Sequence, residues 1–174
     1  GVQFMHIDNP EVKNWLYTRM EATQNRRRMS RDEQLRIFRK LTDAETFEDF
    51  IHKKYLGAKR FSLEGGETLI PLMDMALEGL ARHGVRHAVI GMAHRGRLNV
   101  MTNVMRKPFE VMFQEFKGLN APDIEEGKSL LREDGEDDWS GSGDVKYHLG
   151  TSMDRTYPDG RSVHMALLAN PSHL

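Results

Sequence analysis

Residues 88–97 read Ala88-Val89-Ile90-Gly91-Met92-Ala93-His94-Arg95-Gly96-Arg97, in which an apolar run leads directly into a basic turn. The run is short and contains β-branched residues, which is typical of a buried strand. A second such run spans residues 163–169. Helical patterns lie before and between the two runs, so the sequence predicts an α/β fold with a mainly parallel sheet flanked by helices.

The residues that follow both predicted strands are polar. His94-Arg95-Gly96-Arg97 follows the first strand, and Asn170-Pro171-Ser172-His173 follows the second. Ligands of open α/β sheets bind outside the carboxyl ends of the strands. We therefore expect both clusters to lie on one rim of the sheet and to form a shared binding site for an anion.

The residue types of these clusters suit acid–base and anion chemistry. His94 can donate or accept a proton near neutral pH, and Arg95 and Arg97 present charged forks that match carboxylates or phosphates. Gly96 allows the backbone to approach a ligand closely, and the first turn of the next helix favours an anion. His173 is a candidate second acid or base. The alternatives are that His94 and Arg95 only cap the strand–helix junction and that His173 is an ordinary surface residue.

Other motifs point away from several classes of site. A structural role for His148, bonded to backbone, is as well supported as a role in the site, and His164 is expected to be a core residue inside a strand. No His-x-x-x-His pair lies on a predicted helix, so a zinc site is not favoured. Neither nucleotide-binding glycine motif and no Gly-x-Ser-x-Gly elbow is found in the sequence.

The flanking segments read as helices and loops. We expect a helical segment over residues 1–56, with anchors at Trp15, Leu16 and Tyr17 and capping boxes at Ser30–Glu33 and Thr42–Glu45 that begin short amphipathic helices. An α/β domain should begin at residue 57. Its predicted parts are a loop over 57–66, a helix over 67–82 ended by Gly84, helices after Arg97 and after Pro108, and an exposed acidic loop at 118–143.

The composition limits the classes of protein. The chain has 174 residues, of which 39% are hydrophobic and 29% charged, and its formal net charge is −1. These values predict a globular protein without a general attraction to nucleic acid or to a membrane surface. Cysteine is absent, which excludes disulfides and thiolate catalysis from this stretch. The chain begins in mid-pattern and ends without a stop signal, so we expect a fragment.

Four stretches together resemble a known family. They are residues 57–65 (Gly-Ala-Lys-Arg-Phe-Ser-Leu-Glu-Gly), 91–100 (Gly-Met-Ala-His-Arg-Gly-Arg-Leu-Asn-Val), 143–150 (Gly-Asp-Val-Lys-Tyr-His-Leu-Gly) and 170–174 (Asn-Pro-Ser-His-Leu). In this order they resemble the decarboxylase component of 2-oxoglutarate dehydrogenase. The resemblance covers roughly residues 4–174.

This resemblance implies a fold, an activity and partners. It implies a thiamine-diphosphate-binding fold from residue 57 onward, in an enzyme that uses thiamine diphosphate and Mg²⁺ to decarboxylate 2-oxoglutarate in the tricarboxylic acid cycle. The implied enzyme is a homodimer that passes the succinyl group to the lipoyl domains of a dihydrolipoyl succinyltransferase core, alongside dihydrolipoyl dehydrogenase. The resemblance also implies that His94 and His173 face substrate, that Phe61 lines the same pocket, and that Arg95 contacts the cofactor.

The chain lacks parts of the family pattern. The Gly-Asp-Gly magnesium motif and the glutamate that activates the cofactor are not in the sequence, so the Mg²⁺ ligands should lie outside this chain, which should be inactive alone. Alternatives are the related 2-oxoadipate decarboxylase and a truncated, non-catalytic assembly module. We expect the cytoplasm if the source is bacterial, which is favoured, and the mitochondrial matrix if it is eukaryotic.

Overall fold

The computed structural model describes residues 3–24, 26, 28–116 and 145–170. The chain divides into two compact units, residues 1–35 and residues 36–174. The predicted acidic loop at 118–143 and the predicted site residue His173 lie outside the described residues. The proposed boundary between a helical segment ending at residue 56 and a cofactor domain beginning at residue 57 stays a prediction.

The first unit contains a polar helix, α1 (Pro10–Thr23). The Asn9 side chain caps it, since Asn9 Oδ1 accepts hydrogen bonds from the amides of Glu11 at 2.9 Å and Val12 at 3.2 Å. No residue of α1 is buried, and Trp15 and Tyr17 are both more than half exposed. Neither side chain is packed into a core within this unit, and the expectation that the two act as packing anchors stays a prediction.

Helix α2 (Arg31–Lys54) starts as the sequence predicts and ends later. The Ser30 amide donates to Glu33 Oε2 at 2.9 Å, and the Glu33 amide donates to Ser30 Oγ at 3.2 Å, which is a capping box. The second predicted box does not form, because the Thr42 hydroxyl donates to the Phe38 carbonyl inside one continuous helix. One long helix thus replaces the predicted set of short ones.

Helix α3 (Leu69–Arg82) follows the predicted loop. Pro71 lies in its first turn, where a missing amide proton is tolerated. Gly84 follows the last turn with φ +86°, the left-handed conformation that ends helices and favours glycine. The sequence prediction for this helix and its end is confirmed.

The sheet has three strands, and it is mixed. Strands β1 (His87–Ile90), β2 (Thr151–Thr156) and β3 (Ser162–Leu167) lie in the order β1-β3-β2. β1 and β3 are parallel, whereas β2 and β3 form an antiparallel hairpin. The sequence predicted β1 and β3 but not β2, so the expectation of a mainly parallel sheet holds only for the β1–β3 pair among the described residues.

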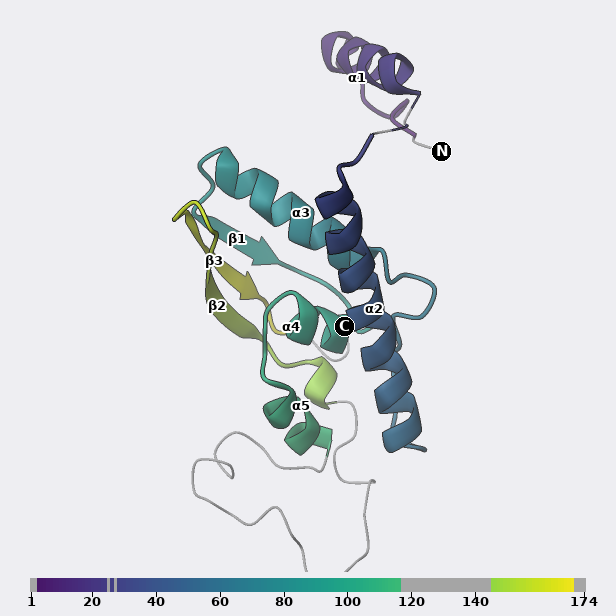
Figure 1. Ribbon diagram of the computed structural model, residues 1–174, viewed down its shortest axis with the longest axis vertical. Coiled ribbons are helices and arrows are strands. Elements are labelled where there is room, and N and C mark those ends of the chain that lie inside the picture. Colours follow the sequence, from purple (N-terminus) through teal and green to yellow (C-terminus); the bar gives the residue numbers. More distant parts are fainter. Residues whose placement is uncertain (1–2, 25, 27, 117–144, 171–174) are drawn as a thin grey trace, which may run out of the picture. The chain divides into compact units, whose positions relative to one another are not determined.

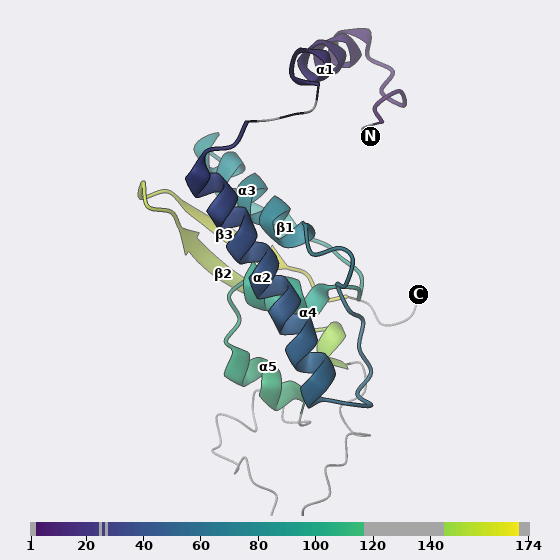
Figure 2. The ribbon, with the colours of Figure 1, turned by 45° about the vertical axis from the view of Figure 1, so that its right-hand side comes forward.

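One face of the sheet belongs to the core. Val163, Met165 and Leu167 of β3 are buried in one hydrophobic cluster with residues of α2, α3, α4 (Arg97–Asn103) and α5 (Phe109–Phe116). Figures 1 and 2 show the part of α2 from Arg36 onward lying beside α3 and α4. The alternate residues of the strands are exposed or half-buried, and Val89 and His164 are among the exposed ones. The described residues thus form an α/β unit of helices on one face of a small mixed sheet.

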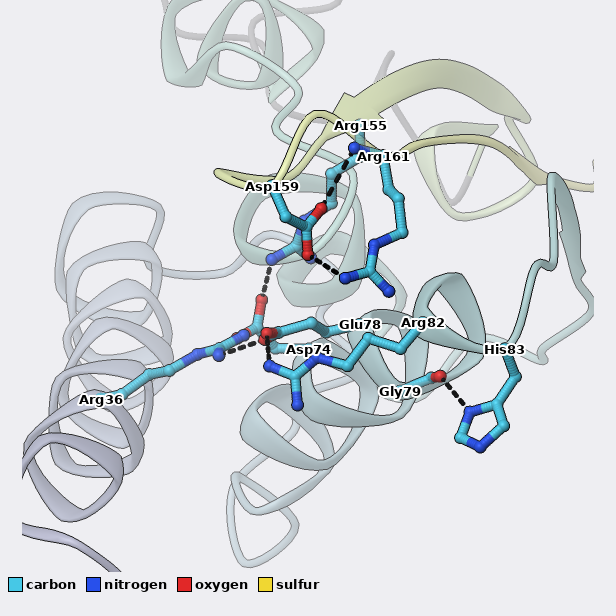
Figure 3. A network of polar contacts seen from close by, with 9 residues as sticks. All are labelled: Arg36, Asp74, Glu78, Gly79, Arg82, His83, Arg155, Asp159 and Arg161. Carbon is cyan, nitrogen blue, oxygen red and sulfur yellow. Dashed lines mark hydrogen bonds and ion pairs between the residues drawn. The ribbon is translucent and has the colours of Figure 1, made fainter.

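A network of charged side chains ties α2, α3 and β2 together (Figure 3). Asp74 is 2% exposed. It accepts a hydrogen bond from Arg36 Nε at 2.8 Å and is also paired with Arg155 of β2. Glu78, one helical turn later, pairs with Arg36 and Arg82. Buried charges are tolerated when they are paired in this way.

None of the helices in the described ranges is both long enough and apolar enough to cross a membrane.

Candidate functional site

The turn after β1 holds the first candidate residues. The chain leaves β1 at Ile90, and the Arg97 amide donates to the His94 carbonyl at 3.0 Å, which closes the turn before α4. His94 is half-buried and Arg95 is exposed, whereas Gly96 and Arg97 are buried. The turn therefore presents an imidazole and one guanidinium to the surface.

Gly96 joins this turn to the loop before α3. Its φ is +73°, and a Cβ at this position would lie 2.5 Å from Leu63 Cδ1. Its amide donates to the Phe61 carbonyl at 3.0 Å. The sequence predicted that Gly96 lets the backbone approach a ligand, whereas in the structure the Phe61–Leu63 loop occupies that space.

Four rings from three separate parts of the chain pack together at this point. The Phe61 and His94 ring centroids are 5.0 Å apart, and those of His94 and His148 are 4.7 Å apart at an interplanar angle of 86°. Tyr147 meets the Phe61 ring edge-on at 4.9 Å. His94 consequently lies between an apolar ring and a second imidazole, an arrangement that suits a ligand with both polar and apolar parts.

His148 connects this cluster to the second predicted turn. Its Nδ1 lies 3.0 Å from the Asn170 carbonyl oxygen, and the Asn170 amide donates to the His148 carbonyl at 3.0 Å. Asn170 begins the Asn-Pro-Ser-His run that follows β3. The two turns predicted to share a rim are therefore linked through His148 as far as Asn170, while the role of His173 stays a prediction.

Tyr147 fixes the position of Phe61. Its hydroxyl oxygen accepts a hydrogen bond from the Phe61 amide at 3.0 Å, and its side chain is almost fully buried. Burial, which disfavours the charged phenolate, raises the pKa of Tyr147 to about 12. The hydroxyl is thus a neutral structural group near neutral pH.

The two arginines of the turn have different roles. Arg95 is exposed and donates from Nη2 to the Glu64 carbonyl at 3.1 Å. Arg97 is 0% exposed and donates to the main-chain carbonyls of Met92, Leu149 and Leu168. The expectation that both arginines are available to an anion is wrong for Arg97, because its donors are already used inside the protein.

A buried polar group supports the loop that carries Phe61. Glu48 of α2 is 4% exposed, and its carboxylate accepts hydrogen bonds from Arg60 Nη1 at 3.2 Å and from Asn99 Nδ2 at 3.1 Å. Arg60 directly precedes Phe61. The Glu48 carboxylate thus anchors the loop to α2 and α4.

One further sequence expectation, for His164, is corrected by the structure. His164 is not a core residue: its side chain is 45% exposed, and its Nδ1 lies 2.8 Å from Asp154 Oδ1. It belongs to the exposed face of β3 because its neighbours in the strand, Val163 and Met165, take the buried face. Among the described residues no group of three or more His, Asp or Glu side chains is arranged to hold a metal ion.

Sequence reasoning left His148 open between a backbone-bonded structural role and a role in the site, and it did not single out Tyr147 or the Arg60–Glu48 pair. His148 and Tyr147 lie in one of the four quoted stretches, and that position was the only sequence signal for Tyr147. Their contacts with Phe61 and His94 span 54 to 86 residues of sequence, so only the fold brings them together.

The fold and the geometry define an α/β region with a candidate site at the ends of its strands. In this site the imidazoles of His94 and His148 are paired beside the exposed Arg95. No protein-family model matches the chain. The 2-oxoglutarate dehydrogenase E1 component of Brucella ovis is 46% identical over 174 residues, which are 100% of this chain and 16% of that protein. Those of Brucella anthropi and Brucella canis are 47% and 46% identical, again over all of this chain and 16% of theirs.

Identity at this level over the whole chain establishes common descent. The chain is homologous along its full length to part of the 2-oxoglutarate dehydrogenase E1 component. It spans 16% of the length of these relatives.

Proposed function

We propose that the protein to which this chain belongs decarboxylates 2-oxoglutarate with thiamine diphosphate and passes the succinyl group to a lipoyl domain. The observation that carries this proposal is the 46–47% identity with proteins named 2-oxoglutarate dehydrogenase E1 component, along the entire chain. Because the chain spans 16% of those proteins, the activity is proposed for the whole protein. This stretch alone is expected to be inactive.

We assign the substrate-facing roles to His94, His173 and Phe61. The substrate is a dianion, so imidazole N–H groups that donate to its carboxylates or to its developing oxyanion would favour the reaction. The ring of Phe61 would pack against the aliphatic part of the substrate. His148 joins this assignment because its ring contacts that of His94 at 4.7 Å.

Arg95 is assigned to the cofactor, and its environment fits a diphosphate. Its guanidinium is exposed, lies next to His94 in sequence, and is oriented by a hydrogen bond to the Glu64 carbonyl. A planar charged fork is a good donor to phosphate oxygens. When bound, thiamine diphosphate supplies the nucleophilic carbon and the electron sink. We propose that residues 57–174 begin a thiamine-diphosphate-binding domain and that the Mg²⁺ ligands come from elsewhere in the protein.

The partners follow from the same proposal. We propose a homodimer that works with a dihydrolipoyl succinyltransferase core and dihydrolipoyl dehydrogenase in the tricarboxylic acid cycle. The relatives are bacterial, which supports the cytoplasm as the compartment.

The experiment uses the full-length protein. CO₂ release from 2-oxoglutarate should require thiamine diphosphate and Mg²⁺, and His94→Ala should lower kcat by roughly a hundredfold or more, the effect of losing one donor to a developing charge. His52→Ala is the matched control, because His52 is an exposed histidine at the end of α2. Unchanged activity of His94→Ala would remove His94 from its assigned role.

A parallel assay with 2-oxoadipate separates the two related activities. A larger kcat/KM for 2-oxoadipate would assign the protein to that substrate instead. CO₂ release from neither acid, by a folded and cofactor-supplied protein, would contradict a decarboxylase and favour a non-catalytic assembly module.

A further inference from the structure

The buried guanidinium of Arg97 lies where three segments of the candidate site meet. Nη1 donates to the Met92 carbonyl at 3.0 Å. Nε and Nη2 donate to the Leu149 carbonyl at 3.3 and 2.6 Å, and Nη2 also donates to the Leu168 carbonyl. One side chain therefore bonds the main chain in three places that are 19 to 76 residues apart in the sequence.

Each of these carbonyls is close in sequence to a residue of the candidate site. Met92 precedes His94 by two residues, Leu149 directly follows His148, and Leu168 precedes Asn170 by two residues. All three carbonyls lie at the same end of the sheet, which is the carboxyl end of the parallel strands β1 and β3 and the amino end of β2. Arg97 thus spans the base of the site.

The guanidinium has no ionic role that would explain its burial. None of the ion pairs formed by the described residues includes Arg97, and burial lowers the pKa of Arg97 without a compensating acid. A buried charge is unfavourable unless hydrogen bonds satisfy it. Here three carbonyls do so, and the planar fork of five N–H donors fixes their relative positions as the point charge of a lysine could not.

We propose that Arg97 is a positioning residue, which sets the spacing between the turns that carry His94, His148 and Asn170. The effect of Arg97 on catalysis rests on the proposed function, whereas its effect on the positions of the three turns does not. In this role Arg97 itself does not touch substrate. It acts through the two imidazoles, whose contact depends on the carbonyls that it holds.

The test compares Arg97→Lys with Arg86→Lys in the full-length protein. Arg86 is an exposed arginine just before β1, so Arg86→Lys is the matched chemical control. Asp74→Asn serves as a second control, because it weakens the same unit through α3 and β2 without touching the turns. For each variant, kcat and KM for 2-oxoglutarate are measured, together with amide hydrogen exchange of segments 91–96, 148–150 and 168–170.

We expect Arg97→Lys to lower kcat and kcat/KM together by roughly a hundredfold, since misplacement of about 1 Å has this effect on a reacting geometry. Exchange should accelerate in all three segments and stay unchanged in α3. Arg86→Lys and Asp74→Asn should keep kcat within about threefold of the wild type. If Arg97 were only a stabilising residue, the folded Arg97→Lys protein would keep its kcat, and that result would overturn the proposal.

The exchange measurement separates the two proposals. If the wild-type protein releases no CO₂ from 2-oxoglutarate, the proposed function fails. The positioning role is then judged by amide exchange alone, and unchanged exchange in the three segments of Arg97→Lys would overturn it as well. If Arg97→Lys does not fold, a crystal structure of the wild-type full-length protein decides. A guanidinium beyond about 3.5 Å from the carbonyls of Met92, Leu149 and Leu168 would contradict the proposal.

Discussion

At the scale of single residues, Gly96 determines how closely the Phe61 loop approaches the His94 turn. Its left-handed φ of +73° and the 2.5 Å that would separate an added Cβ from Leu63 Cδ1 exclude any side chain without rearrangement. Its amide also holds the Phe61 carbonyl. The position of Phe61 beside His94 therefore depends on a residue that has no side chain.

Gly96→Ala should lower the free energy of unfolding by about 2–4 kcal/mol, the sum of a left-handed alanine and an overpacked contact. The matched control is Gly160→Ala in the β2–β3 turn, with φ +81° and nothing within 4 Å of an added Cβ. The free energy of unfolding of this control should fall by only about 1–2 kcal/mol. Urea unfolding curves of both variants give the comparison, and equal losses would contradict the role of the Leu63 contact.

Single residues also show how much of the site could be predicted from the sequence. His94 and Arg95 could be found because they directly follow a recognisable strand, and the carboxyl end of a strand is a common place for ligands. Arg97 has the same residue type and the same turn, but its side chain points into the protein. The direction of a side chain after a strand depends on tertiary packing, which no local pattern contains.

At the scale of elements, the charged network of Asp74 explains a strand that the sequence did not predict. β2 reads Thr-Ser-Met-Asp-Arg-Thr and lacks the apolar alternation of a half-buried strand. Arg155 nevertheless takes the buried side of β2, because Asp74 of α3 pairs with it there. An ion pair between distant residues replaces the apolar contact that a strand pattern requires.

Helix α2 shows the opposite error, a boundary that was predicted and does not exist. The Thr42–Glu45 spacing matches a capping box, but Ala44, Phe47 and Ile51 form one buried stripe that continues through it. The burial of this stripe against α4 and α5 outweighs the local capping signal. Local signals were reliable where packing agreed with them, as at Ser30 and Gly84.

Asp74→Ala should lower the free energy of unfolding by about 3–5 kcal/mol, because it leaves the nearly buried Arg155 without its acid. Asp49→Ala, which removes the exposed partner of Lys53 in α2, should lower it by no more than about 0.5 kcal/mol. Denaturant unfolding of both variants tests the difference. A small effect of Asp74→Ala would show that the network does not join α3 to β2.

The ion pair between Asp74 and Arg155 makes the stability of the protein depend on pH. Burial disfavours the Asp74 carboxylate, but the hydrogen bonds and charges of Arg155 and Arg36 outweigh burial, so the pKa of Asp74 is lowered. A folded-state pKa below the unfolded one means that this stabilisation is present at neutral pH. It is lost as the pH falls below the ordinary range of a carboxyl, and Asp74→Asn should lose less stability over that interval.

At the scale of the whole molecule, the candidate site exists only because three distant segments meet. Phe61 comes from the loop before α3, His94 from the turn after β1, and Tyr147 and His148 from the segment before β2. The chain spans 16% of the length of the relatives that it matches. The remaining groups that the proposed reaction needs would come from the rest of the protein to which the chain belongs.

A double-mutant cycle in the full-length protein tests whether His94 and His148 act as one unit. The rate of CO₂ release from 2-oxoglutarate is measured for wild type, His94→Ala, His148→Ala and the double variant. Residues that act together have strongly non-additive effects, so we expect the double variant to be little slower than the slower single one. Effects that simply multiply, or a single variant with the wild-type rate, would mean that the two imidazoles do not act together.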